Sequence, residues 1–131
     1  MVDQHGAIVD TTFEPDIPEE TIVKLYKDML FISILDVIMF DAQRQGRLSF
    51  YMVSAGEEAV PIGTSSVLDR DDVIFTQYRE QGAYRERGMT TKQFMAQLFA
   101  SKDDPGRGRN MPVHYGSDEL NIVSSAQLPD V

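Results

Sequence analysis

The sequence contains no cysteine and only two histidines among its 131 residues. Without cysteine a chain can form neither a disulfide framework nor a thiolate metal site, and two histidines are too few to favour a zinc site. A lack of cysteine also fits a reducing compartment. We therefore expect packing alone to hold the core together.

Basic residues are scarce as well, since twelve Lys and Arg stand against twenty-one Asp and Glu, a formal net charge of −9. Binding along nucleic acid requires a basic surface, so this composition argues against a generic nucleic-acid binder. The first twenty residues hold six acids and no Lys or Arg, whereas eight of the twelve basic residues fall between Arg70 and Arg109. Any anion site is therefore expected in the second half.

Targeting and membrane segments are also missing from the sequence. The acidic amino terminus is the opposite of an Arg-rich mitochondrial presequence, and no apolar segment of a secretory signal follows it. The apolar stretch from Met29 to Phe40 is interrupted by Ser33 and Asp36 and is shorter than the roughly twenty apolar residues that span a bilayer. We expect one globular domain, no membrane association, and any targeting segment outside this sequence.

Local signals predict an extended arm over residues 1–17 and a folded part over residues 18–131. Proline at position 18, followed by two glutamates, is typical of a helix start, and Gln45-Gly46 supplies a stop, which predicts a helix over 18–45. Ser54 with Glu57, and Thr90 with Gln93, have capping-box spacing. They predict helices over 55–68, kinked by Pro61, and over 91–100, the latter burying Phe94, Met95, Leu98 and Phe99.

Two short strands complete the predicted elements. Residues 73–76 form a short apolar run bounded by turn residues, which predicts one buried strand, and residues 120–123 are a candidate second strand. The predicted fold class is therefore α/β, incomplete and predominantly helical, with one or two short strands.

The long helix raises a problem of burial. From Met29 to Phe40 its residues are apolar on nearly every face, over a helix of about 40 Å. Residues 46–131 offer few elements to cover it, so we infer that partner surface is missing. The alternative is a small bundle in which the two later helices cover it.

The segment Gln77-Tyr78-Arg79-Glu80 directly follows the first predicted strand. Ligands of open α/β sheets bind beyond the carboxyl ends of strands, and Arg79 with Tyr78 could grip a phosphorylated cofactor. The alternative is structural: an arginine paired with a nearby acid and a tyrosine packed at the strand end.

Other polar residues carry less specific signals. His114 follows a loop rich in glycine and arginine, where it could donate a proton or bind a substrate carboxylate, although a loop histidine is more often an ordinary surface or hydrogen-bonded residue. Arg107 and Arg109 could bind phosphate or a partner's acids, or could simply be solvated. Walker, nucleophile-elbow and dinucleotide motifs are absent, so the residues themselves indicate only a possible anion site.

Seven stretches, in their order and spacing, closely resemble the alpha subunit of branched-chain 2-oxo acid dehydrogenase over about residues 13–125. The related pyruvate dehydrogenase alpha subunit resembles them less well. The stretches are residues 15–20 (PDIPEE), 25–30 (LYKDML), 41–47 (DAQRQGR), 49–52 (SFYM), 77–80 (QYRE), 94–97 (FMAQ) and 111–116 (MPVHYG).

This resemblance implies the N-terminal part of a thiamine-diphosphate-binding fold and an enzyme of branched-chain amino acid catabolism. The family carries out the oxidative decarboxylation of branched-chain 2-oxo acids in the mitochondrial matrix. It works as an alpha2-beta2 tetramer with a beta subunit and transfers the acyl group to the lipoyl group of a transacylase core. Its cofactors are thiamine diphosphate, magnesium and potassium.

The resemblance also assigns residues. The family's Gln-Tyr-Arg segment contacts the cofactor phosphates, which carries over to Gln77, Tyr78 and Arg79. A later family segment, Ser-Ser-Pro-Leu-Ala-Thr-Gln, implies a cofactor contact at Ser125 and potassium ligands at Ser124 and Gln127. Here Ser125 runs straight into Ala-Gln-Leu-Pro, a departure that weakens the expectation of a potassium site.

Other expectations concern what this sequence can do alone. The family's magnesium-binding Gly-Asp-Gly segment does not occur in it. Phe50 and Tyr51 are candidate walls of the substrate pocket, and His114 is the only catalytic candidate. We expect the isolated chain to be an inactive fragment. The alternatives are a non-catalytic piece that still associates with other subunits and a small helical scaffold unrelated to catalysis.

Overall fold

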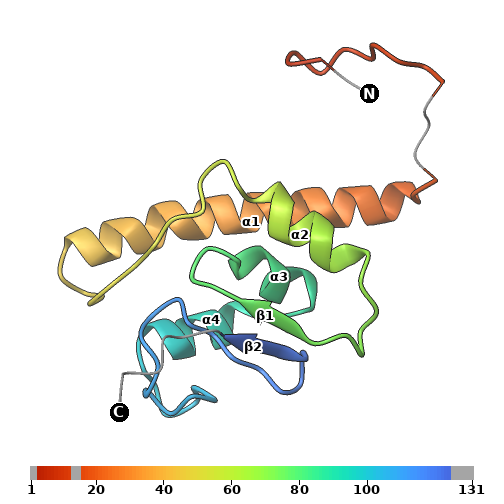
Figure 1. Cartoon of the computed structure of the whole chain (residues 1–131). Coiled ribbons are helices and arrows are strands. Elements are labelled where there is room, and N and C mark those ends of the chain that lie inside the picture. The colour runs from red at the N-terminus through yellow and green to blue at the C-terminus, as the bar shows by residue number, and fades with distance from the viewer. Residues whose placement is uncertain (1–2, 13–15, 125–131) are drawn as a thin grey trace.

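The computed structural model describes residues 3–12 and 16–124, and its elements are mostly helical (Figure 1). Two short strands lie side by side below α1, α2 and α3, with α4 next to them. The predicted α/β class with predominant helix therefore holds for these residues. In chain order the elements are α1 (Glu19–Arg44), α2 (Ala59–Ser66), β1 (Ile74–Thr76), α3 (Gln81–Glu86), α4 (Thr91–Leu98) and β2 (Ile122–Ser124).

Helix α1 confirms the predicted long helix and runs unbroken through its apolar stretch. Glu19 and Glu20 lie in the first turn, where negative charge is stabilised by the positive end of the helix dipole. The helix ends where Gly46 adopts a φ of 73°, a conformation that favours glycine. Both ends thus follow the signals in the sequence.

Helix α2 is shorter than predicted, and the capping box at Ser54 was wrong. The cap position is Glu58, without a side-chain cap, while Ser54 bonds to Asp36 on α1. Pro61 is the third residue of α2, where a backbone N–H would have no partner within the helix. The proline therefore has no reason to kink α2.

Helix α4 confirms the capping box at Thr90, whose hydroxyl accepts from the Gln93 backbone while the Gln93 side chain accepts in return. Phe94 and Leu98 are buried as predicted, but Phe99 is 48% exposed because it lies at the C-cap, beyond the buried face. Helix α3 was not predicted. The residue at its N-cap makes no side-chain capping hydrogen bond, so no local signal in the sequence indicates this six-residue helix.

The second predicted strand is confirmed, because β2 pairs in parallel with β1, and Thr76 lies opposite Ser124. The prediction of a buried first strand was wrong for two of its three residues. Thr76 is buried, but Phe75 is 72% exposed. Side chains alternate across a strand, and the described elements cover only one face of this two-stranded sheet.

The core lies between α1 and the later elements and is held by close packing. The ring of Phe94 meets that of Tyr115 edge to face, with centroids 5.0 Å apart. Helix α3 lies so close to α2 that a Cβ at Gly82 would come within 2.7 Å of Ile62 Cγ1. The buried apolar side chains are mainly Ile32, Leu35, Met39, Leu48, Tyr51, Ile62, Tyr84, Met89, Phe94, Leu98, Val113, Tyr115 and Ile122.

The other side of α1 is exposed, so the small-bundle alternative is wrong. Eight large apolar side chains on this helix are 40% to 64% exposed, although none of the described helices is long and apolar enough to cross a membrane. We call them the outer face of α1. They are Ile22, Val23, Tyr26, Leu30, Ile34, Val37, Ile38 and Phe40.

Candidate functional site

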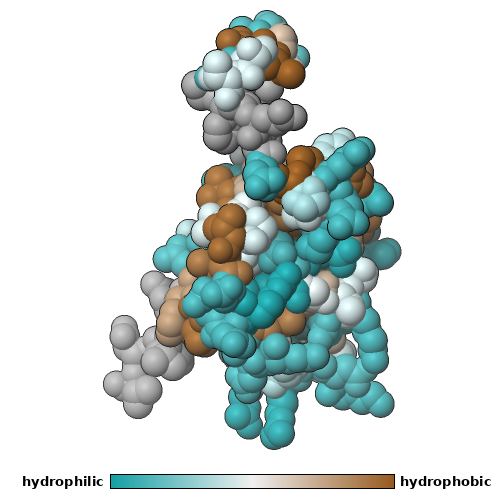
Figure 2. All heavy atoms as spheres, turned by 90° about the vertical axis from the view of Figure 1, so that its right-hand side faces the viewer, coloured by the Kyte–Doolittle hydropathy of each residue, from teal (hydrophilic) through white to brown (hydrophobic). Residues whose placement is uncertain are grey.

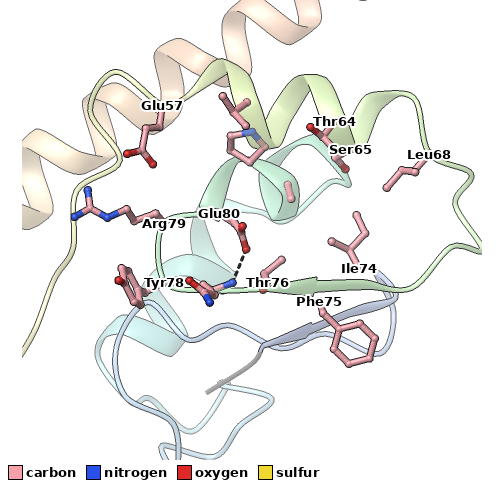
Figure 3. Close-up of a pocket in the computed structure, with 14 residues that line it drawn as sticks. Glu57, Thr64, Ser65, Leu68, Ile74, Phe75, Thr76, Tyr78, Arg79 and Glu80 are labelled. Atoms are coloured by element: carbon pink, nitrogen blue, oxygen red, sulfur yellow. Dashed lines mark hydrogen bonds between the residues drawn. The ribbon is translucent and has the colours of Figure 1, made fainter. Parts of the chain in front are cut away.

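A groove of about 520 Å³ lies between α2 and β1 and extends to the loop that follows β1 (Figure 3). Its floor is apolar, with contributions from Val60, Pro61 and Leu68 on one side and Ile74 on the other. Thr64, Ser65 and Thr76 also line it, while its charged residues, with Gln77 and Tyr78, sit toward one end. They are Glu57, Gln77, Tyr78, Arg79 and Glu80.

Arg79 lies at this polar end, just beyond the carboxyl end of β1, and is partly buried. Its Nη1 donates to the Val53 carbonyl oxygen at 3.1 Å, and its guanidinium lies 5.9 Å from the centre of the Tyr78 ring. It forms no ion pair with any residue that the structure describes. The alternative of an acid-paired arginine is therefore wrong, and most donors of the guanidinium fork remain available to an anion.

Tyr78 is 38% exposed, and its ring lies 6.3 Å from that of His114. Nδ1 of His114 lies 3.1 Å from the Pro112 carbonyl oxygen, which fixes the ring of this half-buried residue. Two segments distant in sequence thus meet here. Tyr78 and Arg79 line one end of the groove, and His114 lies against the Tyr78 ring without lining the groove itself.

Carboxylates line the groove too. Glu80 accepts a hydrogen bond from the Gln77 backbone N–H, which fixes the turn after β1, and Glu57 lies across the groove from this turn (Figure 3). The negative charges of Glu57 and Glu80, beside the single positive charge of Arg79, disfavour the binding of an anion. A phosphate ligand would therefore gain from a cation bound with it.

A buried carboxylate, missed by sequence reasoning, supports this loop from behind. Asp36 of α1 is 3% exposed, and its Oδ2 accepts from the Ser54 backbone N–H at 2.6 Å and from the Ser54 hydroxyl at 3.1 Å. Its Oδ1 accepts from the Tyr51 hydroxyl at 2.8 Å. The residue bonded to Arg79, Val53, is the neighbour of Ser54. Asp36 therefore anchors the segment on which Arg79 rests.

Gln81 extends this network across the core. Its side-chain oxygen lies 3.2 Å from the hydroxyls of both Tyr51 and Tyr115, and its amide nitrogen donates to the Met52 carbonyl. Burial, then the negative charge of Asp36, raises the pKa of Tyr51 well above its ordinary value. Burial is also the main cause of the raised pKa of Tyr115. Both tyrosines are therefore held neutral as donors rather than poised to lose a proton.

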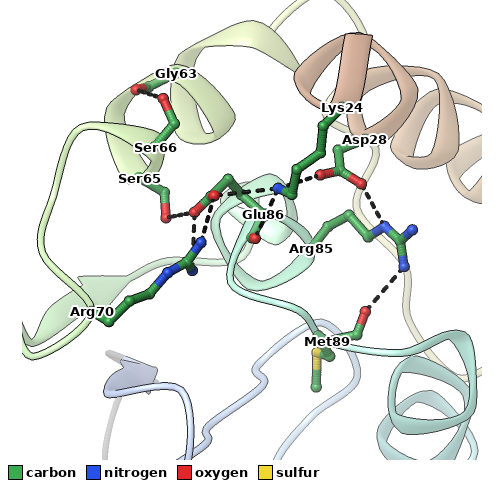
Figure 4. Close-up of polar contacts among 9 residues, drawn as sticks. All are labelled: Lys24, Asp28, Gly63, Ser65, Ser66, Arg70, Arg85, Glu86 and Met89. Atoms are coloured by element: carbon green, nitrogen blue, oxygen red, sulfur yellow. Dashed lines mark hydrogen bonds and ion pairs between the residues drawn. The ribbon is translucent and has the colours of Figure 1, made fainter. Parts of the chain in front are cut away.

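A second cluster of charges joins α1, α2 and α3 (Figure 4). Buried Glu86 pairs with Lys24 at 3.3 Å and with Arg70 at 3.0 Å, and it accepts from Ser65 at 2.9 Å. Lys24 also pairs with Asp28, which in turn binds Arg85. Both buried acids of this cluster, Asp28 and Glu86, therefore have basic partners, and the cluster holds the three helices together. Its side chains also line a second open cavity of about 580 Å³.

The remaining predicted residues lie elsewhere. Phe50 and Tyr51 do not line the groove, and Tyr51 is 6% exposed, so their role as substrate-pocket walls stays a prediction. Arg107 and Arg109 are exposed on the loop after α4. In that loop buried Asp104 accepts from the Gly106 and Gly108 backbones.

The predicted potassium segment is described only in part. Oγ of Ser124 is buried and has no hydrogen-bond partner among the described residues, which end at this position, so its role as a potassium ligand stays a prediction. Ser125 and Gln127 lie outside the described residues. Within residues 3–12 and 16–124, no group of three or more acids and histidines could hold a metal ion.

Comparison with known proteins gives one family. The model of the family described as "Dehydrogenase E1 component" matches residues 26–129. The chain is 44% identical over 135 residues to the 2-oxoisovalerate dehydrogenase subunit alpha 2, mitochondrial, of Arabidopsis thaliana, covering 99% of this chain and 29% of the relative. The Homo sapiens and Caenorhabditis elegans alpha subunits are 42% and 43% identical, each over 95% of this chain and 28% or 30% of theirs. The chain thus spans under a third of each relative's length.

Proposed function

The chain belongs to the dehydrogenase E1 component family, and on that premise we propose that it supplies part of the cofactor-phosphate site of a branched-chain 2-oxo acid dehydrogenase alpha subunit. The family depends on thiamine diphosphate. The observation that carries the proposal is the position of Arg79, at the carboxyl end of β1 with an unpaired guanidinium facing a groove.

The relatives' names support the substrate class. Alpha subunits from a plant, a nematode and a mammal are all named for 2-oxoisovalerate, a branched-chain 2-oxo acid, and as mitochondrial. We propose the same substrate class and the mitochondrial matrix for this chain. The proposed partners are a beta subunit, in an alpha2-beta2 tetramer, and the lipoyl-bearing transacylase core that receives the acyl group.

The described residues fit the diphosphate end of the cofactor. Arg79 offers a planar fork suited to phosphate oxygens, and the hydroxyl of Tyr78 adds a neutral donor beside it. Once bound, thiamine diphosphate supplies the chemistry of decarboxylation. In the proposal, the residues of this chain hold and orient its phosphates, and Asp36 keeps the segment under Arg79 in place.

Glu57 and Glu80 make a bound cation part of the proposal. Their carboxylates line the groove that holds Arg79, so the diphosphate needs positive charge beyond one guanidinium. Magnesium would supply that charge from ligands outside the described residues. For potassium, the unpartnered hydroxyl of Ser124 is the fitting ligand among them.

We also propose that the chain is inactive when isolated. One charge-assisted hydrogen bond contributes about 1.5–3 kcal/mol, whereas millimolar binding already requires about 4 kcal/mol. The outer face of α1 also leaves eight large apolar side chains without cover. Titration calorimetry of the purified chain with magnesium and thiamine diphosphate should show no saturable heat. A micromolar isotherm would contradict this part of the proposal.

The site itself is tested in an alpha2-beta2 enzyme whose alpha subunit carries these 131 residues. Arg79→Ala should raise the apparent cofactor constant by roughly ten- to a hundredfold, the effect of losing one or two charge-assisted bonds. Arg47→Ala, an exposed arginine in the turn after α1 with no assigned role, is the matched control and should change nothing. Unchanged cofactor dependence in Arg79→Ala would remove this residue from the site.

A further inference from the structure

Val113 has a backbone conformation that its side chain disfavours. Its φ is 67°, in the left-handed region, where a β-branched residue is an outlier. It is the only β-branched residue among the described residues with positive φ, since the others are glycines, Ala100, Arg107 and Asn121. Conformations of this kind persist only where the surrounding structure imposes them, and they gather at functional sites.

Burial and one glutamine hold Val113 in this conformation. Its side chain is 1% exposed, although other apolar side chains reach the surface among hydrophilic ones in the view from the end at which α1 begins (Figure 2). Gln97 of α4, itself buried, accepts from the Val113 backbone N–H at 3.1 Å. The Gln97 amide nitrogen donates to the carbonyl oxygens of Met111 at 2.7 Å and His114 at 3.4 Å. We call these three bonds the Gln97 clamp.

The clamp fixes the backbone on both sides of Val113, and the side chain that it directs is that of His114. Nδ1 of His114 lies 3.1 Å from the Pro112 carbonyl oxygen. A carbonyl oxygen can only accept, so Nδ1 carries the proton of this bond. The imidazole lies 6.3 Å from the Tyr78 ring and is tilted by 57° to it, within the range of ring contacts.

The ring of Tyr78 depends on its neighbours for its position. Tyr78 is 38% exposed, and its hydroxyl forms no hydrogen bond within the described part of the chain. Its ring contacts there are the imidazole of His114 and the guanidinium of Arg79, 5.9 Å from the ring centre. Tyr78 and Arg79 line the groove, and both are labelled in Figure 3. A ligand in the groove therefore meets Tyr78, with His114 behind it.

We propose that His114 is a positioning residue, held against Tyr78 by the strained turn at Val113, so that the Tyr78 hydroxyl is in place before the cofactor phosphates bind. This inference rests on the proposed function, because it concerns the same phosphate site. A side chain that is ordered before binding loses less conformational freedom on binding, which strengthens the complex. The strain at Val113 is then the cost of directing His114 toward Tyr78.

The geometry favours positioning over proton transfer by His114. A general acid or base must come within hydrogen-bond distance of the reacting group. His114 does not line the groove, and its Nδ1 proton is given to Pro112. What the imidazole offers to the site is a surface against which the Tyr78 ring packs.

NMR of the full chain tests this contact without any activity. The chain has two histidines, and His5 is exposed, so His5→Gln leaves His114 as the single imidazole. At pH ~8.5, where an ordinary imidazole is neutral, we expect ¹⁵N shifts of the Nδ1–H tautomer, whereas free histidine favours Nε2–H. Tyr78→Leu should change the ring-proton shifts of His114. An Nε2–H tautomer, or shifts that ignore Tyr78→Leu, overturns the proposal.

Gln97→Leu tests the clamp, because it removes all three bonds from a side chain of similar size. We expect the imidazole signals of His114 to move toward those of free histidine, while circular dichroism shows that the helices remain. Unchanged signals in a folded Gln97→Leu chain would show that the clamp does not direct His114, and the proposal is then wrong. If this variant does not fold, the tautomer and the Tyr78→Leu shifts decide.

Kinetics in an alpha2-beta2 enzyme whose alpha subunit carries these residues separates positioning from catalysis. His114→Asn keeps a donor for Pro112 but removes the ring. It should raise the apparent thiamine diphosphate constant about three- to tenfold, the effect of one side chain losing its order, and lower kcat at saturating cofactor less than about twofold. His114→Phe keeps a ring beside Tyr78 and should recover most of the loss. Lys102→Ala, exposed on the loop after α4, is the control.

Two outcomes contradict the positioning role in this enzyme. A large fall of kcat at saturating cofactor in both His114 variants would mean that the imidazole transfers a proton. An unchanged cofactor constant in His114→Asn, where Arg79→Ala raises it, would overturn this inference and leave the phosphate site standing. No change in Arg79→Ala would instead contradict the phosphate site, and with it the role given to His114.

Discussion

Ser54 donates both its backbone N–H and its hydroxyl to one carboxylate oxygen of Asp36, 18 residues earlier on α1. The bond from the backbone is 2.6 Å long, and both residues are buried. This contact fixes the position of the segment that connects α1 and α2. The carbonyl of the preceding residue, Val53, then receives the guanidinium of Arg79.

We expect Asp36→Ala to destabilise the chain by about 3 kcal/mol, because it leaves the donors of Ser54 and Tyr51 buried without an acceptor. Urea unfolding followed by circular dichroism measures the change. The matched control is Asp71→Ala, an exposed acid in the turn before β1, which should fall within about 0.5 kcal/mol of the parent chain. Equal costs for the two variants would show that the buried network contributes little.

The same contact explains why one capping box was predicted correctly and the other was not. Thr90 and Gln93 form a local box that depends only on neighbours three residues apart, so spacing suffices to find it. Ser54 has the same spacing to Glu57, but its donors are taken by Asp36, a tertiary contact invisible to local patterns. In the sequence, Asp36 looked like an interruption of an apolar run.

The candidate site was predictable in part for similar reasons. A strand followed by Tyr78 and Arg79 can be read from the sequence, and the structure has both at the polar end of a groove. The approach of His114 to Tyr78 depends on how the loop after α4 returns, which spacing does not give. Helix α3 was missed because it is held by packing against α2, through Gly82, rather than by its own caps.

Gly82→Ala should destabilise the chain by about 1–3 kcal/mol. Its new Cβ would lie 2.7 Å from Ile62 Cγ1 and 3.0 Å from Pro61 Cγ, so α2 and α3 would have to move apart. The control is Gly63→Ala on α2, where a Cβ meets nothing within 4 Å and alanine should stabilise the helix by about 0.5–1 kcal/mol. Thermal unfolding of both variants checks the opposite signs. A stabilised Gly82→Ala variant would contradict the close approach.

The buried side chain of Tyr84 should make the folded chain less stable as pH rises into the alkaline range. Burial, its largest cause, raises the pKa of Tyr84 to about 12, whereas an unfolded tyrosine titrates near 10. The unfolded chain therefore releases this proton first. The stabilisation is complete below pH ~10 and should decline by about 2–3 kcal/mol as pH rises from ~10 to ~12.

Urea unfolding at a series of pH values tests this decline. Tyr84→Phe should be less stable at neutral pH, because it loses the bonds to Thr76 and to the Tyr115 carbonyl. It should also show a shallower loss between pH ~10 and ~12. The pKa values of Tyr51 and Tyr115 are also raised, so the Tyr84→Phe variant should still lose stability as pH rises. Identical slopes in the parent chain and Tyr84→Phe would mean that this tyrosine does not contribute.

Glu86 has two basic partners, and this makes the effects of removing them non-additive. Lys24 and Arg70 have side chains that are 49% and 61% exposed, whereas the side chain of Glu86 is 4% exposed. Removing either base leaves the other to neutralise the buried acid, so Lys24→Met and Arg70→Met should each cost about 1 kcal/mol or less. Removing both leaves a buried charge without a counterion. That state is typically destabilising by about 3–5 kcal/mol, so the double variant should cost clearly more than the sum of the single ones.

A double-mutant cycle by urea unfolding measures this coupling, and Glu86→Gln supplies its internal control. In that background the buried charge is gone, so the effects of Lys24→Met and Arg70→Met should become additive. Lys92→Met, which removes the exposed pair with Asp103, should be near neutral in every background. Additive losses with Glu86 intact would show that solvent, rather than the two bases, neutralises this carboxylate, and the cluster would then be a minor contributor to joining α1, α2 and α3.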